Sequence, residues 1–108
     1  MRHAEPHDRP AQFFFQTLGN SVRWGIVQLL RRRGPQPAHA ICRALRMEQS
    51  RCSHNLRRLE RCGFLTARRN GRERVYALNV RTVGPLLTLV DRHVHAFCAR
   101  VCVRRAKS

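Results

Sequence analysis

Apolar positions recur at helical spacing along most of this chain and alternate only in one short stretch. The helical spacing predicts five helices, over residues 11–18, 21–33, 38–45, 48–63 and 79–104. Residues 65–69 and 72–78 show rough alternation, which predicts two strands between the fourth helix and the last. The expected fold class is therefore mainly α with a small β-hairpin.

The fourth helix has one apolar stripe and one strongly basic face. Its apolar or small positions are spaced i, i+4, i+7, i+11, and they are Cys52, Leu56, Leu59 and Gly63. The other side chains can donate to phosphates or contact base edges, and they are Gln49, Ser50, Arg51, Ser53, His54, Asn55, Arg57, Arg58 and Arg61. Gly63 stands where a left-handed stop is expected. This division predicts a helix that packs with one side and binds DNA with the other.

A basic hairpin follows the fourth helix. Asn70 and Gly71 form a two-residue turn signal, because both central residues of that turn need positive φ. Four arginines flank the turn: Arg68, Arg69, Arg72 and Arg74. Residues 46–47 connect the third and fourth helices closely, as a helix-turn-helix requires. The combination predicts a winged helix-turn-helix, and the alternative is an ordinary helix and hairpin with a solvated charged face.

The charge of the chain is strongly one-sided. Its 108 residues include 22 Lys plus Arg against 6 Asp plus Glu, a formal net charge of +16, and Lys107 is the only lysine. Arginine is weakly hydrated and forks onto phosphates, so this balance favours a nucleic acid partner. No segment is long and apolar enough to span a bilayer and no signal peptide opens the chain, so we expect no membrane partner.

The two ends of the chain predict a homodimer. Residues 1–10 are polar and are expected to be a disordered arm before one domain over residues 11–108. The aromatics Phe13, Phe14 and Phe15 suggest a dimer interface, although closing the monomer core is an equal alternative. The last helix has an apolar stripe at Leu86, Val90, Val94, Phe97 and Val101. Pairing through these terminal helices would place two basic helices about 34 Å apart on a palindromic site.

The five cysteines occur without a signal peptide, which indicates a reducing compartment rather than a disulfide framework. Cys42 and Cys52 lie on apolar stripes and are expected to be small buried hydrophobic residues. Cys98 and Cys102 are four residues apart on one helix face and can share a soft metal ion. Simple burial is the alternative for these two and for Cys62.

From residue 17 to residue 78 the sequence resembles the ArsR/SmtB family of bacterial and archaeal metal- and redox-responsive repressors. The family's second-helix signature is similar to residues 17–30, TLGNSVRWGIVQLL. Its recognition helix is similar to residues 49–59, QSRCSHNLRRL. Its wing is similar to CGFL at 62–65, RNGR at 69–72 and VYAL at 75–78. The resemblance implies a dimeric repressor whose affinity for DNA falls when an inducer binds elsewhere.

The resemblance also implies roles in DNA binding. The roles are major-groove contacts for Gln49, Ser50, Ser53 and His54, a phosphate contact for Arg57 and a minor-groove contact for Arg72. The exposed face and the hairpin add Arg51, Arg69 and Arg74 to the candidate DNA-binding residues. Glu48 stands where the family often has a serine cap, and a carboxylate also suits a helix N-terminus.

The same resemblance limits the kinds of inducer that this chain is expected to bind. Three inducer sites of the family are disfavoured, because this chain lacks their ligands. Pro37 and His39 stand where the arsenic-type site has its cysteine pair, and Gln28 stands where sulfide-sensing members have a cysteine. The zinc-type site is disfavoured because three of its ligand positions hold Val80, Thr82 and Ala96. Cys62 resembles a ligand of cadmium- and lead-responsive members. Those members have a second cysteine on the same helix, and Arg58 replaces it in this chain. We therefore expect Cys62, Cys98 and Cys102, from one or two subunits, to bind Cd(II), Pb(II) or As(III).

These observations predict a cytoplasmic, sequence-specific repressor that a soft metal(loid) ion releases from double-stranded DNA. One alternative is a repressor of the same fold that responds to oxidation or to another effector. Another is a constitutive architectural protein that binds nucleic acid by charge alone. An enzyme is not expected, because the sequence shows no nucleophile–base pair, phosphate loop or paired carboxylates.

Overall fold

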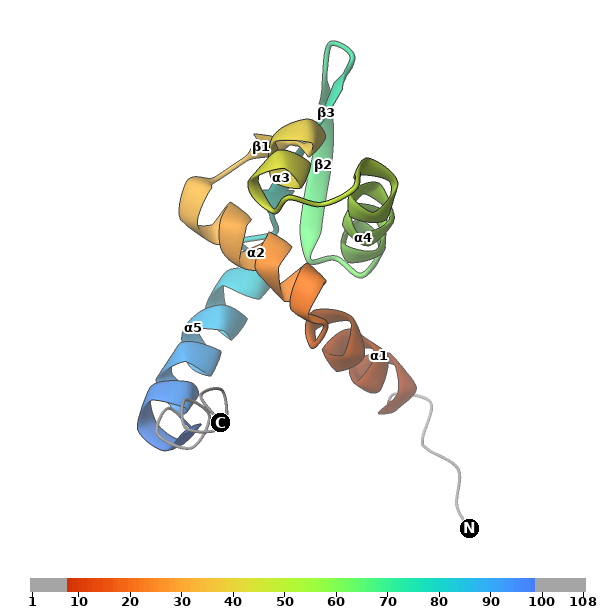
Figure 1. Ribbon diagram of the computed structural model, residues 1–108. Helices are drawn as coiled ribbons and strands as arrows, with labels where there is room; N and C mark the ends of the chain where they lie inside the picture. The colour runs from red at the N-terminus through yellow and green to blue at the C-terminus, as the bar shows by residue number, and fades with distance from the viewer. Residues whose placement is uncertain (1–7, 99–108) are drawn as a thin grey trace.

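The computed structural model describes residues 8–98, and these form a mainly helical domain with a small sheet (Figure 1). The elements in chain order are α1 (Asp8–Leu18), α2 (Ser21–Arg33), β1 (Gln36–Pro37), α3 (Ala38–Ala44), α4 (Gln49–Arg61), β2 (Leu65–Asn70), β3 (Glu73–Leu78), α5 (Val83–His93) and a short π-helix, η1 (Val94–Cys98). The hairpin of β2 and β3 projects beyond the helices at one end, and α1 and α5 diverge at the other. The winged helix-turn-helix fold is therefore confirmed. None of the helices in residues 8–98 is long and apolar enough to cross a membrane.

The bounds of α2 agree with the prediction because both ends carry strong local signals. The Asn20 side-chain oxygen accepts hydrogen bonds from the backbone N–H groups of Val22 (3.0 Å) and Arg23 (3.1 Å), which caps the first turn. Gly34 ends the helix with a φ of 77°, a conformation that glycine adopts without strain.

The first helix begins earlier than expected, at Asp8 rather than at residue 11. Asp8 provides a negative charge in the first turn, where the helix dipole favours it. Pro10 is also in that turn, where a missing N–H group costs no helical hydrogen bond. Three residues of the expected disordered arm are therefore helical, and residues 1–7 lie outside the described part of the chain.

The last helix begins later than expected, at Val83 rather than at residue 79. The Asn79 side chain donates to the carbonyl of Gly63 (2.9 Å), and its backbone N–H donates to the carbonyl of Phe64 (2.9 Å). These bonds fasten Asn79 to the end of α4 and keep it out of the helix. Pro85 is consequently the third residue of α5, in the first turn that tolerates proline. The predicted helical residues 99–104 lie outside the described range.

The sheet contains a strand that was not predicted. The strand order is β1-β3-β2, with antiparallel pairing throughout, and β1 is only the dipeptide Gln36–Pro37 paired with Tyr76 and Val75. Two residues are too few for alternation to be seen in a sequence, so only the folded chain reveals this strand.

The turn of the hairpin is shifted by one residue from the prediction. Asn70 pairs with Glu73, so the central turn residues are Gly71 and Arg72. Gly71 has a φ of 66°, whereas Arg72 does not share the positive φ, which matches a type II′ turn with glycine first. The shift places Arg72 at the tip of the wing itself.

The hydrophobic core lies between α2, α3, α4, the sheet and the N-terminal part of α5. Its fully buried side chains include Ile26, Leu30, Ile41, Leu56, Leu59, Phe64 and Leu87. The predicted stripe of α5 is only partly covered in one chain, since Leu86 and Val90 are half-buried and Val94 and Phe97 are exposed. The residues of α5 that are buried are instead Val83 and Leu87.

A disulfide between Cys42 and Cys52 corrects the expectation of free, reduced cysteines. Both residues are buried, as expected, but their Cα atoms are 5.7 Å apart, within the range that a disulfide requires. The packing of α3 against α4 brings them together, and this proximity is not visible in a spacing of ten residues along the chain.

Candidate nucleic-acid interface

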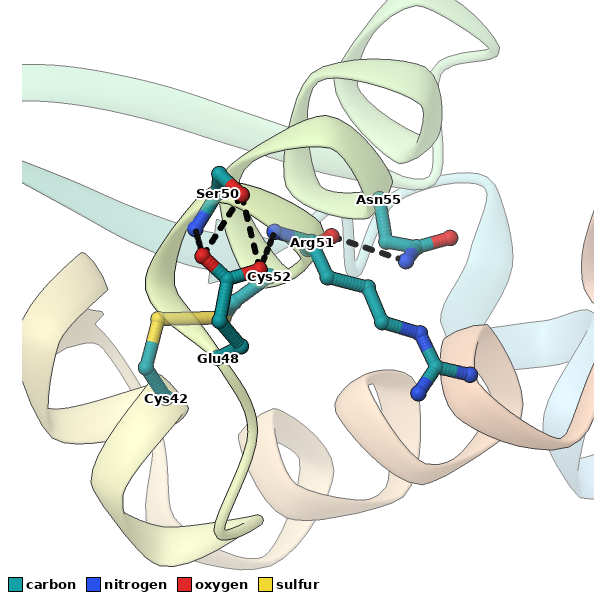
Figure 2. Close-up of a disulfide and its surroundings, with 6 residues drawn as sticks. All are labelled: Cys42, Glu48, Ser50, Arg51, Cys52 and Asn55. Carbon is teal, nitrogen blue, oxygen red and sulfur yellow. Dashed lines mark hydrogen bonds between the residues drawn. A yellow bond between two sulfur atoms is a disulfide. The ribbon is translucent and has the colours of Figure 1, made fainter.

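The first turn of α4 is fixed by Glu48. One carboxylate oxygen accepts from the N–H of Ser50 (3.1 Å), and the other accepts from the N–H of Arg51 (3.2 Å). The Ser50 hydroxyl also donates to both carboxylate oxygens, as Figure 2 shows. These hydrogen bonds, that from the Ser50 hydroxyl above all, lower the pKa of Glu48. Glu48 therefore caps α4, as expected, and the same bonds occupy the hydroxyl of Ser50.

Most of the predicted DNA-facing side chains of α4 lie together on its exposed side. Gln49, Ser50, His54, Arg57 and Arg61 are exposed, and Ser53 is half-buried. Arg51 is also exposed, but Figure 2 shows it pointing to a different side of the helix from Ser50. The exposed side therefore combines three small polar groups, one imidazole and two guanidinium groups, a set that can contact both bases and phosphates.

Asn55 and Arg58 were expected on this exposed face, but the structure places both elsewhere. Asn55 is buried, with 6% of its surface exposed, and its amide donates to the Arg51 carbonyl (2.9 Å). Its side-chain oxygen accepts from the guanidinium of the buried Arg23 (3.0 Å). Arg58 is half-buried and stacks on the Phe13 ring, 4.8 Å from the centroid. Both positions lie on the flank of α4 that faces α1 and α2.

Arg23 is a buried cation that sequence analysis missed. Its Nε donates to the Thr17 carbonyl (2.7 Å), and its Nη1 donates to the side-chain oxygen of Asn55 (3.0 Å). Burial lowers the pKa of Arg23 and the nearby Arg58 cation lowers it further, whereas Cys62 acts in the opposite direction. This network connects the start of α2 to the middle of α4, so it positions the helix that carries the exposed basic face.

The wing places its arginines in two different environments. Arg69 and Arg72 are exposed near the tip, as a minor-groove contact requires. Arg74 instead donates to both carboxylate oxygens of Glu60 on α4 (2.9 and 2.8 Å) and to the Tyr76 hydroxyl (3.2 Å). The hydrogen bond to Glu60 is the main reason that the pKa of Arg74 is raised.

The contact between Glu60 and Arg74 lies in a groove between α4 and the wing. The groove has a volume of about 660 Å³, and its lining includes Ser53, Arg57, Glu60, Arg61, Arg74 and Tyr76. Glu60 is thus an acidic residue in a surface otherwise rich in cations, and we did not predict a role for it. Its signal in the sequence is its position, since it is the only acid within the basic helix Gln49–Arg61.

The candidate metal-binding cysteines do not meet within the described part of one chain. Cys62 is half-buried at the end of α4, with its sulfur 3.6 Å from the Thr17 hydroxyl. Cys98 is half-buried in η1, which extends α5 away from α4 (Figure 1). Cys102 lies outside the described residues, and residues 8–98 contain no group of three or more His, Cys, Asp or Glu placed to hold a metal ion. The three-cysteine metal site therefore stays a prediction, because Cys102 lies outside the described residues.

Comparison with known proteins identifies a helix-turn-helix region. A family model described as a helix-turn-helix domain matches residues 18–68. The HTH-type transcriptional regulator NmtR of Mycobacterium tuberculosis is 40% identical over 72 residues, which cover 67% of this chain and 59% of NmtR. This chain therefore matches less than two thirds of the length of that relative. The solution structure of apo-NmtR shares 32% identity, covers 91% of this chain and 83% of its own, and has a TM-score of 0.66.

Two further solved structures share the fold over nearly the whole chain. The crystal structure of Rv0081 from Mycobacterium tuberculosis has a TM-score of 0.79 at 28% identity and covers 95% of this chain and 99% of its own. The homodimeric winged helix-turn-helix DNA-binding domain Mb0332 from Mycobacterium bovis, a possible ArsR-family regulator, has a TM-score of 0.77 at 25% identity. It covers 91% of this chain and 94% of its own.

Proposed function

This chain belongs to the ArsR/SmtB family of winged helix-turn-helix transcriptional regulators, and we propose that it is a homodimeric repressor released from DNA by a soft metal(loid) ion. The observation that supports the DNA-binding part is the outward side of α4, which carries Gln49, Ser53, His54 and Arg57. α4 lies beside the basic wing, and Ser53, Arg57 and the wing residue Arg74 line one groove. The residues behind this face are buried, so the helix is held with its polar side outward. A repressor of this kind would act in the cytoplasm.

The exposed apolar residues of the terminal helices support a dimer. Phe15 is 62% exposed, Leu89 63% and Phe97 73%, although each is a large apolar side chain. They belong to α1, α5 and η1, which lie at the end of the molecule opposite the wing (Figure 1). A second copy covering these residues would leave both wings and both α4 helices free for a palindromic double-stranded operator. The similar domain Mb0332 is homodimeric, which supports the same arrangement here.

The proposed inducer site consists of Cys62, Cys98 and Cys102, completed across the dimer. Thiolates favour soft ions, so Cd(II), Pb(II) and As(III) suit this set. Cys62 follows directly on the last residue of α4, so ligation there acts on the end of the recognition helix. A 100-fold loss of DNA affinity requires roughly 2.7 kcal/mol of differential binding between the two states. Soft-metal thiolate ligation is strong enough to provide this difference.

The test begins by isolating a DNA site with the full chain from a random-sequence pool. Fluorescence anisotropy would then compare that duplex with a scrambled duplex of equal length, with and without each ion. We expect preference for the selected duplex and a loss of affinity of about 100-fold with at least one ion. Cys62→Ser and Cys98→Ser should each abolish the response to the ion.

Other outcomes would identify the alternatives. Equal, strongly salt-dependent affinity for both duplexes would indicate an architectural protein that binds by charge. A response to the ion that survives Cys62→Ser and Cys98→Ser would show that the inducer binds elsewhere.

A further inference from the structure

The disulfide joins the two helices of the helix-turn-helix at the base of the recognition helix. Cys42 belongs to α3, and Cys52 is the fourth residue of α4 (Figure 2). Ser53 follows Cys52 directly in the sequence. Cys52 is fully buried and 6% of Cys42 is exposed, so both sulfur atoms belong to the core beneath the α3–α4 connection. None of the roles proposed above uses this pair.

The segment between the two cysteines is already tightly constrained by the backbone. The Met47 N–H donates to the carbonyl of Cys42 (2.9 Å), Arg46 has a φ of 51°, and Glu48 caps α4. The sulfur–sulfur bond closes this segment into a covalent loop. The bond therefore connects the first turn of α4 to α3. The placement of Gln49, Ser50 and Ser53 depends on the position of that turn.

Breaking the bond removes the covalent link between α3 and the first turn of α4. Bonded sulfur atoms are about 2 Å apart, whereas unbonded heavy atoms in contact require roughly 3.5–4 Å. The interior around the pair is close-packed, so it has little free space to absorb the difference. We expect the contact between α3 and the first turn of α4 to loosen on reduction, which would displace side chains of that turn that are candidates to contact DNA bases.

We propose that Cys42 and Cys52 are a thiol–disulfide modification site, that a hydroperoxide forms the bond and a dithiol reduces it, and that the bonded form binds DNA more tightly. The inference rests on the proposed function, since DNA affinity is its readout. It is separate from the metal site, which uses three other cysteines.

The chemistry follows from the exposure of the two residues. Cys42 is the more exposed of the two residues, 6% against 0%, so we expect its thiolate to attack one peroxide oxygen. The O–O bond breaks, a sulfenic acid forms on Cys42, and the other oxygen leaves as hydroxide, or as an alkoxide when the peroxide is organic. The Cys52 sulfur then attacks the Cys42 sulfur and releases water, so two electrons pass from the two sulfurs to the peroxide. For reduction, a thiolate of the dithiol attacks Cys42 and releases Cys52, and its second thiol then releases Cys42. The dithiol leaves as its own disulfide.

The test uses the full chain, oxidised with hydrogen peroxide or reduced with dithiothreitol, in the presence of a metal chelator. Each form first selects a duplex from random-sequence DNA, and anisotropy at fixed salt then gives the dissociation constants. We expect reduction to weaken binding by about tenfold, within the usual range for coupling between two states. After tryptic digestion of the oxidised form, mass spectrometry should find peptide 34–43 linked to peptide 52–57.

The double variant Cys42→Ala/Cys52→Ala is the matched control, because it retains the other three cysteines and should not respond to peroxide. Equal affinities of the oxidised and reduced wild type, with the linked peptide present, would overturn the proposal. So would a peroxide response that persists in the double variant. If neither form selects any DNA sequence, the proposed function fails instead, and the two failures are thereby distinguished. The wild-type comparison alone decides the case if the double variant does not fold.

Discussion

At the scale of single residues, the basic surface contains one acid whose position changes how its neighbour acts. Glu60 binds the guanidinium of Arg74, so the arginine that the sequence assigned to DNA is partly neutralised in the free protein. The pair is partly exposed, with side-chain exposures of 30% for Glu60 and 49% for Arg74. Such pairs contribute little to stability, so replacing Glu60 should leave the fold intact.

We expect Glu60→Gln to raise the affinity for DNA and to steepen its salt dependence. Without the carboxylate, Arg74 is free to contact one phosphate, which adds about 0.9 to the magnitude of the slope of log K against log salt. Anisotropy titrations between about 50 and 200 mM salt measure this slope.

The matched control is Glu73→Gln. It also removes one negative charge, here from the wing, but it leaves the contact between Glu60 and Arg74 in place. Glu73 has His39 as its partner, 3.5 Å away. If both substitutions changed the slope equally, the effect would be one of net charge, and the pairing of Glu60 with Arg74 would have no role of its own.

At the scale of elements, α4 is held by polar contacts as well as by apolar packing. Asn55 accepts from Arg23 and donates to the Arg51 carbonyl, so one buried amide connects α2 with α4. Phe14, on α1, packs on the buried Phe64, which follows α4, with ring centroids 4.6 Å apart. The middle aromatic of Phe13, Phe14 and Phe15 therefore closes the core, whereas its two neighbours are exposed.

We expect Asn55→Ala to lower the free energy of unfolding by about 1–3 kcal/mol, because it leaves a buried guanidinium donor without its acceptor. Urea denaturation followed by circular dichroism measures the change. Gln49→Ala, an exposed substitution on the same helix, should stay within about 0.5 kcal/mol of the wild type. Equal stabilities of the two variants would mean that the Arg23–Asn55 hydrogen bond contributes nothing to the fold.

At the scale of the whole molecule, the two ends of the domain have chemically different surfaces. The basic wing and α4 occupy one end, and the exposed apolar residues of α1, α5 and η1 occupy the other (Figure 1). This separation allows a dimer to form without covering the candidate DNA-binding surface. A regulator that must contact two half-sites at once requires that arrangement.

We expect Phe97→Glu to prevent the proposed dimer from forming at micromolar concentration. Burial of a phenylalanine stabilises an interface by roughly 1.5–3 kcal/mol. A two-fold dimer contains the substitution in both copies, so we expect the dimer affinity to fall by at least about 100-fold. Sedimentation velocity gives the oligomeric state directly. Val80→Glu is the control, because Val80 is 66% exposed but precedes the opposite end of α5. A dimer that persists with Phe97→Glu would place the interface elsewhere.

The sequence by itself determined the fold class, most element bounds and the exposed basic face. These features depend on local signals: the caps at Asn20 and Glu48, the turn glycine Gly71 and the apolar stripe of α4. Local signals are readable because they act between residues a few positions apart.

Only the tertiary structure decided what happens between distant residues. It paired Cys42 with Cys52, buried Asn55 against Arg23, bound Arg74 to Glu60 and added β1 to the sheet. The physical reason is that helix packing angles and strand register bring such groups together. Neither the packing angle nor the register produces a repeating pattern of residues that can be recognised in the sequence. A cysteine on an apolar stripe has the same pattern whether it is free or bonded, so the proposed redox site became visible only when α3 and α4 were packed together.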